Sequence, residues 1–111
     1  MIMNATDWNT ALYEKMSDEQ DKFRDWLKSQ PPEEILHHTY EYTVREDIVM
    51  AMEQLELTDA QAQALLDSSS PLADVYRYFE KLETGYMDVI RDSIENRADD
   101  VCRAKEELRT T

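Results

Sequence analysis

The side chains best suited to chemistry are two adjacent histidines, His37 and His38, and one cysteine, Cys102. Glu34 and His37 have the Glu-x-x-His spacing with which di-iron bundles place a carboxylate and an imidazole on one helix face. Glu41 follows His37 by about one helical turn. A di-iron centre needs a second such pair with bridging glutamates, and a zinc site needs a third protein ligand. The sequence supplies neither, so we predict no metal and no cofactor.

Other kinds of catalysis also lack their residue patterns. The sequence has no nucleophile elbow and no phosphate-binding loop, and one glycine in 111 residues leaves no Gly-rich turn. Adjacent carboxylates, such as Asp99 and Asp100 or Glu106 and Glu107, point in different directions on a helix and do not suit a general acid and base. Cys102 fits better as a small packed residue than as a reactive thiol. We therefore predict that the chain is not an enzyme.

The charge of the chain limits its partners. Against 12 Lys and Arg stand 25 Asp and Glu, which gives a formal net charge of −13. This charge excludes direct binding to nucleic acid over a broad basic face, and an anionic membrane would repel the chain. The sequence lacks the run of about 18 apolar residues that a membrane span needs, and its N-terminus lacks the pattern of a signal peptide. With a single cysteine, the expected location is the cytoplasm.

Helical periodicity predicts the elements that carry these side chains. Apolar residues recur at threes and fours in four segments, with helix starts at Thr6, Pro32, Thr58 and Ser70-Pro71: residues 7–29, 32–55, 59–66 and 71–108. The first segment has a second capping pattern at Ser17, which leaves open whether it is one helix or two. The last is long for a small domain, so we expect a break at Gly85 or within Asn96 to Asp100.

These segments predict an all-α fold: a single small helical bundle of four to five helices with a long C-terminal helix. The chain has the length of one domain, residues 1–111, in which the part from about Asp99 is frayed or depends on a partner. The stripe on the second segment predicts a buried face that includes Leu36 and Tyr40. The aromatic residues expected in the core are Trp8, Phe23, Tyr40, Phe79 and Tyr86.

The negative charge is concentrated in the middle of the chain. Residues 29–76 contain ten acidic residues and the single base Arg45. We expect an exposed acidic surface that could imitate phosphates or meet a basic partner, formed by Glu46, Glu53, Glu56, Asp59 and Asp67. Beside it, the expected aromatic anchors are Tyr42, Tyr76 and Tyr78. Two plainer interpretations stay open: acidic residues that only keep the chain soluble, and tyrosines that are half-buried with their hydroxyls in water.

The amino-acid sequence resembles that of a known family over nearly its whole length. The stretches are LYEKMSDEQDKFRDWLKSQPPEEILHHTYEYTVREDIVMAME and PLADVYRYFEKLETGYMDVIRDSIENRA. They resemble small proteins of unknown function that are encoded on conjugative and integrative mobile elements of gut bacteria. Such elements carry small acidic inhibitors of host nucleases, of the anti-CRISPR and antirestriction kinds. The resemblance carries no catalytic residue.

Two functions therefore remain from the sequence. The first is a non-catalytic inhibitor that binds a basic, nucleic-acid-binding nuclease of host defence through the acidic surface. The alternative is an N-terminal assembly module of a larger mobile-element protein, with no inhibitory role and with a homodimer formed through the C-terminal helix. Apolar residues that continue to Val101 and Leu108 favour the alternative.

Overall fold

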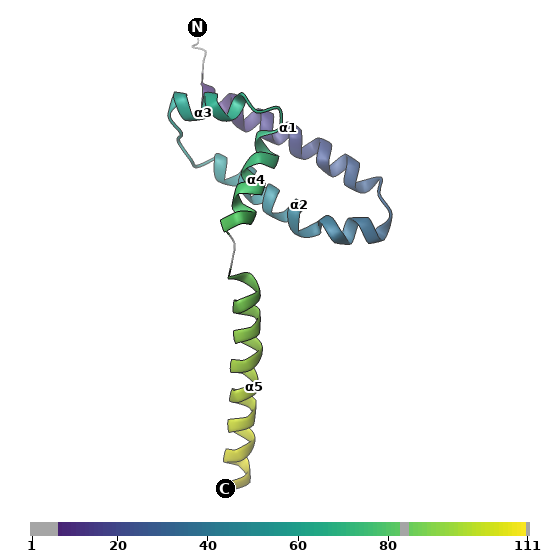
Figure 1. Cartoon of the computed structure of the whole chain (residues 1–111), viewed down its shortest axis with the longest axis vertical. Coiled ribbons are helices and arrows are strands. Elements are labelled where there is room, and N and C mark those ends of the chain that lie inside the picture. Colours follow the sequence, from purple (N-terminus) through teal and green to yellow (C-terminus); the bar gives the residue numbers. More distant parts are fainter. Residues whose placement is uncertain (1–6, 83–84, 111) are drawn as a thin grey trace. The chain divides into compact units, whose positions relative to one another are not determined.

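The computed structural model describes residues 7–82 and 85–110, and the regular structure in these ranges is entirely helical. The all-α prediction is confirmed. The helices are α1 (Trp8–Lys28), α2 (Pro32–Met52), α3 (Asp59–Leu66), α4 (Pro71–Leu82) and α5 (Tyr86–Thr110), as Figure 1 shows. The chain divides into two compact units, Met1–Phe79 and Glu80–Thr111, which are described separately. The single domain over residues 1–111 stays a prediction.

The helix boundaries follow local chemistry. Asp7 caps α1, because its carboxylate accepts a hydrogen bond from the Thr10 backbone N–H at 3.1 Å. The predicted cap Thr6 lies outside the described residues. α1 runs through Ser17 without interruption, so the first segment is one helix. It ends before Pro31-Pro32, and Pro32 occupies the first position of α2, where its missing N–H costs nothing.

The remaining boundaries match the sequence pattern in part. α2 ends at Met52, three residues before the predicted end. α3 begins with the predicted capping box, in which Thr58 and Gln61 exchange side-chain and backbone hydrogen bonds. Gly85 directly precedes α5, as expected for a break at this residue. The segment from Asn96 to Asp100 is helical, and α5 continues through the expected frayed tail to Thr110.

Four helices meet in one apolar core. Its buried members are Leu12 and Met16 of α1, Met52 of α2, Ala62 of α3 and Leu72 of α4. Leu12, Ala62 and Leu72 are completely buried. Burial of a side chain such as Leu12 stabilises the fold by about 1.5 to 3 kcal/mol, so this small cluster is the main source of stability in the α1 to α4 unit.

Two charged side chains of α1 hold the junction between α3 and α4. The Lys15 Nζ donates to the backbone carbonyls of Leu66 and Ser68, at 2.9 and 2.7 Å. One turn further along α1, the two carboxylate oxygens of Glu19 accept from the backbone N–H groups of Leu72 and Ala73, at 2.8 and 2.9 Å. A cation thus meets the C-terminal end of α3 and an anion meets the N-terminal end of α4. Both charges complement the helix dipoles and satisfy backbone groups that helix ends leave unpaired.

The predicted buried face of α2 is wrong in its first half. Leu36 is 73 % exposed and Tyr40 is 43 % exposed. The face that meets α1 here lies on roughly the opposite side of α2, where His38, Tyr42 and Arg45 lie against aromatic residues of α1. The interface is built from charge and aromatic contacts, which an apolar stripe does not reveal.

Other aromatic positions also differ from the prediction. Phe79 and Tyr86, expected in the core, are 37 % and 53 % exposed. Trp8 and Phe23 are partly buried. Tyr76, expected at the surface, is a core residue, because it follows the buried start of α4 by one turn and lies on the same helix face as Leu72.

Candidate functional site

Four carboxylates surround one surface hollow of about 370 Å³ in the α1 to α4 unit. We call these residues, Asp7, Glu53, Glu56 and Asp59, the acidic rim. Asp7 caps α1, Glu53 follows the end of α2, Glu56 lies in the loop and Asp59 begins α3. All four are exposed. Glu53, Glu56 and Asp59 belong to the acidic surface predicted from the sequence, and the structure adds Asp7 from another part of the chain.

The loop between α2 and α3 shapes the hollow. After Met52 the chain makes tight turns, in which the Glu53 and Gln54 N–H groups bond to carbonyls three residues back. The Asn9 Nδ2 then donates to the Leu55 carbonyl at 2.7 Å, which fastens the loop to the first turn of α1. The acidic rim is therefore positioned by a contact between residues 46 positions apart in the sequence.

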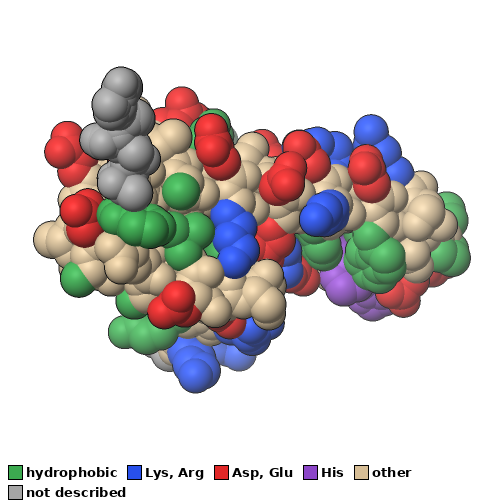
Figure 2. Space-filling model, turned by 90° about the horizontal axis from the view of Figure 1, so that it is seen from above, with side chains coloured by type: hydrophobic (Ala, Val, Ile, Leu, Met, Phe, Trp, Pro, Cys, Tyr) green, Lys and Arg blue, Asp and Glu red, His purple; other side chains and the backbone are tan. Residues whose placement is uncertain are grey.

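The acidic rim carries charge that is not neutralised locally. Within residues 7–82 and 85–110, no ion pair joins a rim carboxylate to a basic side chain. The Thr10 hydroxyl and N–H hold the pKa of Asp7 below its usual value, which favours its ionised form. Asp7 and Asp59 lie at helix N-termini, where the dipole stabilises an anion. Figure 2 shows acidic side chains at its left-hand end, and both acidic and basic side chains along the rest of this face.

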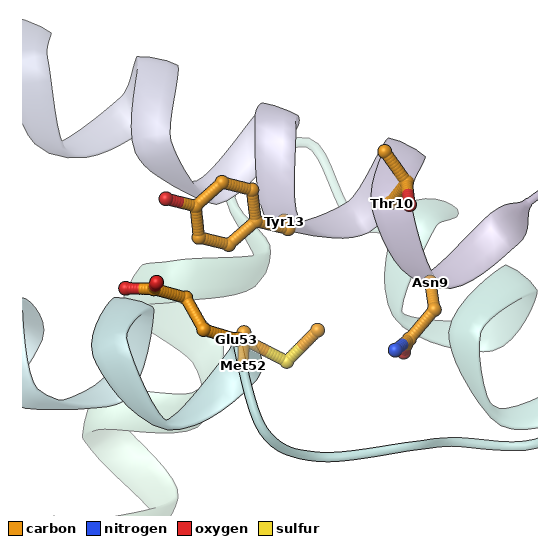
Figure 3. A pocket seen from close by; sticks show the side chains of 5 residues that line it. All are labelled: Asn9, Thr10, Tyr13, Met52 and Glu53. Atoms are coloured by element: carbon orange, nitrogen blue, oxygen red, sulfur yellow. The ribbon is translucent and has the colours of Figure 1, made fainter.

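A second hollow, of about 340 Å³, adjoins the first and shares Asn9 and Glu53 with it. Figure 3 shows Asn9, Thr10 and Tyr13 on α1 facing Met52 and Glu53 at the end of α2. The Tyr13 hydroxyl and the Glu53 carboxylate lie at the same edge of this hollow. A carboxylate beside an aromatic ring can accept hydrogen bonds from a lysine or arginine and offer its side chain a flat surface.

Two of the predicted acidic residues lie apart from the rim. Glu46 faces α1, where its Oε1 accepts from the Gln20 Nε2 at 3.0 Å and lies 3.5 Å from the Arg24 Nη2. Its side chain is 40 % exposed, and its charge is partly balanced by Arg24. Asp67 is exposed at the opposite end of α3 from Asp59, about 12 Å along the helix.

The three predicted tyrosine anchors have three different surroundings. Tyr78 is 65 % exposed and suits an anchor. Tyr42 is partly buried, and its hydroxyl accepts a hydrogen bond from the Arg24 Nε at 2.9 Å. Tyr76 is 8 % exposed, so the prediction that it is a surface anchor is wrong. None of the three lines either hollow beside the acidic rim.

A polar interface between α1 and α2 was missed by sequence reasoning. Arg45, the one base in the middle of the chain, is 8 % exposed. Its guanidinium binds Glu41 at 2.8 Å, lies 3.8 Å from Glu19 and sits over the Phe23 ring at 4.2 Å. Gln20 is 2 % exposed, and its Oε1 has no partner in the described part of the chain. In the sequence, the only sign of this interface was that Arg45 is the single base among ten acidic residues in residues 29–76.

Comparison with known proteins gives one result. The sequence profile of a family described as "Protein of unknown function (DUF3848)" matches residues 8–102. The chain belongs to this family. The match begins at the first residue of α1 and ends within α5, so for this DUF3848 member it covers all five helices at least in part. A search of curated proteins and a search of solved structures found no match.

The histidines of this DUF3848 chain do not form a site with other ligands. His37 is exposed. His38 is partly buried between Glu34 and Glu41, with N to O distances of 3.6 and 3.4 Å, and its ring lies edge-on to Trp26. Within the described ranges, no group of three or more His, Cys, Asp or Glu could hold a metal ion, and no helix is long and apolar enough to cross a membrane. Cys102 is exposed, so the expectation that it is packed is wrong.

Proposed function

We propose that this chain is a non-catalytic protein-binding module of a mobile genetic element, and that its acidic rim binds a basic surface on a partner protein. The observation that carries the proposal is the gathering of Asp7, Glu53, Glu56 and Asp59 around one hollow, where no basic side chain of the described residues pairs with them. Complementary fields of this kind raise association rates and select partners.

The proposed partner is a nuclease of host defence, whose nucleic-acid groove the acidic rim occupies in place of phosphates. The mobile-element context rests on the resemblance of the sequence to proteins of conjugative and integrative elements. A groove built for phosphates offers lysine and arginine side chains, which carboxylates can accept in charge-assisted hydrogen bonds.

A charge-reversal experiment tests this proposal. The triple variant Glu53→Lys, Glu56→Lys and Asp59→Lys is compared with Asp92→Lys, Asp99→Lys and Glu106→Lys, which makes the same change of net charge on the polar face of α5. We expect the first variant to weaken binding to a purified CRISPR or restriction nuclease by at least about a hundredfold and the second by less than about threefold. Glu46 is left unchanged because Gln20 and Arg24 need it.

The readouts are affinity at two salt concentrations and DNA cleavage by the nuclease in the presence of the protein. Binding through the acidic rim weakens as salt rises, and inhibition falls in parallel. Equal loss of binding in both triple variants would show a general effect of net charge and contradict a role for the rim. Circular dichroism confirms that both variants keep their helices.

The alternative function, an N-terminal assembly module of a larger mobile-element protein, is favoured by a separate observation. The apolar side chains of α5 that are exposed include Ile94, Val101 and Leu108. These side chains belong to the unit Glu80–Thr111, so an assembly formed through them would not involve the acidic rim.

A further inference from the structure

The apolar side chains of α5 follow a heptad pattern. Spacings of alternately three and four residues run from Met87 to Leu108, which is about three heptads and about 32 Å of helix. The a positions are Met87, Ile94, Val101 and Leu108, and the d positions are Ile90, Arg97 and Ala104. The intervening positions are mostly charged or polar, so the apolar residues form a single narrow stripe.

The side chains at the a positions of this stripe are exposed. Ile94 is 64 % exposed, Val101 is 37 % exposed and Leu108 is 78 % exposed. Two ion pairs along α5 are local, between Arg91 and Asp88 and between Arg103 and Asp100, and exposed pairs of this kind contribute little stability. A 25-residue helix with an apolar seam gains most of its stability from a second helix that covers the seam.

The charges beside the stripe favour one particular partner. At the e positions Arg91 and Lys105 are bases and Ala98 is uncharged, whereas at the g positions Asp100 and Glu107 are acids and Ser93 is uncharged. In a parallel pair of α5 helices, a g residue faces the e residue of the next heptad, which places Asp100 opposite Lys105 of the other copy. An antiparallel pair would place e beside e and g beside g, so that like charges meet. We propose that α5 binds the α5 of a second copy of this chain as a parallel, in-register, two-stranded coiled coil.

The residues of the stripe agree with this assembly. β-Branched residues at a positions, here Ile94 and Val101, favour two strands over three or four. Arg97 is the exception, because a charged side chain at a d position lowers the stability of a coiled coil while restricting its register. The dimer is therefore expected to be in exchange with the monomer and to depend on concentration.

The first test compares two substitutions of the same kind on one helix. In the full chain, Val101→Glu places a charge in the seam, whereas Val89→Glu places it at an outer c position that is already 62 % exposed. We expect sedimentation equilibrium to show at least about a tenfold rise in the dimer dissociation constant for Val101→Glu, and less than about a twofold change for Val89→Glu. A monomer at all concentrations for the unchanged protein, or equal effects of both variants, would overturn the proposal.

A second substitution guards against a variant that only unfolds α5. Arg97→Leu removes the charge from the seam, so it should lower the dimer dissociation constant by at least about tenfold. Loss of helix cannot produce this result. If Arg97→Leu leaves the dissociation constant unchanged, residue 97 does not lie in the interface and the assigned register is wrong.

Orientation is tested by a cysteine at the end of the stripe. In the variant Cys102→Ser with Leu108→Cys, a parallel in-register pair brings the two introduced thiols together, and mild oxidation should give a covalent dimer. An antiparallel pair would place each thiol near the opposite helix end, and a failure to crosslink would overturn the parallel arrangement. The acidic rim plays no part in these measurements, so failure here leaves the proposed function standing.

Discussion

The two ends of the α1 to α2 pair are held together in different ways. At one end Leu12, Met16 and Met52 lie in an apolar cluster to which α3 and α4 also contribute. At the other end α1 and α2 meet through Arg45, which lies over the Phe23 ring and 3.8 Å from Glu19. Four helices can bury an apolar core, whereas two helices alone exclude too little water for one. The polar end is therefore held by contacts in which each side chain needs one particular partner.

The polar end contributes more to specificity than to stability. A buried ion pair such as Arg45 with Glu41 gains little over an apolar pair, because both charges lose their hydration. The register of α1 against α2 is fixed instead by contacts between the helices, because a shift would take Arg45 away from both the Phe23 ring and the Glu19 carboxylate. The apolar end tolerates small shifts, and the polar end selects the register.

The largest expected effect lies at the apolar end. Leu12→Ala leaves a cavity where four helices meet and should lower the free energy of unfolding by about 4 kcal/mol. Urea denaturation followed by circular dichroism measures the change. Leu36→Ala is the matched control, because Leu36 is 73 % exposed and its loss should change stability by less than about 0.5 kcal/mol. Similar losses in both variants would show that Leu36 is covered and that the face assigned to α2 is wrong.

A somewhat smaller effect is expected where the polar end meets α4. Glu19→Ala removes the acceptor for the Leu72 and Ala73 N–H groups and one carboxylate near Arg45. We expect a loss of about 3 kcal/mol in the free energy of unfolding, because two helix-end donors and a buried cation each lose a partner.

Glu19→Gln separates the two roles of this side chain. Its amide oxygen can still accept from α4, but it carries no charge for Arg45, so the loss should be about half that of Glu19→Ala. The measurement is again chemical denaturation. Equal losses for the two variants would assign the whole effect to charge and contradict the importance of the helix cap.

The same contrast explains how far the sequence could predict this fold. The helix boundaries at Pro32 and Thr58 depend on local chemistry and were predicted correctly, and Gly85 was one of the two break points that the sequence left open. The buried face of the first half of α2 was not, because Leu36 and Tyr40 continue an apolar spacing that carries no information about charge pairs across an interface. Periodicity identifies a face that could be buried, and the partner helix decides whether it is.

The acidic rim was predictable only in part for a related reason. Glu53, Glu56 and Asp59 are neighbours in the sequence, so their gathering follows from one short loop. Asp7 joins them through the Asn9 contact to Leu55, between residues far apart in the chain. Glu46 is partly exposed but points to α1, where Gln20 and Arg24 contact its carboxylate. Contacts over long sequence separation add residues to a site and remove others, and spacing along one helix reports neither.

The smallest expected effect is a pH dependence at the start of α4. Hydrogen bonds from the side chains of Ser68 and then Arg77 hold the pKa of Asp74 below its usual value of 3.8. A carboxyl whose pKa is lowered in the folded state adds stability above about pH 3.8, and this contribution is lost as the pH falls through the folded value. Asp74→Asn should therefore reduce stability near neutral pH, and the difference from the unchanged protein should shrink as the pH is lowered toward about 3.

Ser68→Ala serves as the companion variant, because it leaves the carboxylate in place and removes the main cause of its lowered pKa. Its acid unfolding should begin at a higher pH than that of the unchanged protein. Acid titrations of all three proteins, followed by circular dichroism, give the comparison. Identical acid transitions would mean that Ser68 does not bind Asp74 in solution. A shift would show that the polar junction around α4 responds to pH, as expected of an interface built from charge, whereas the Leu12 cluster has no titrating group to respond.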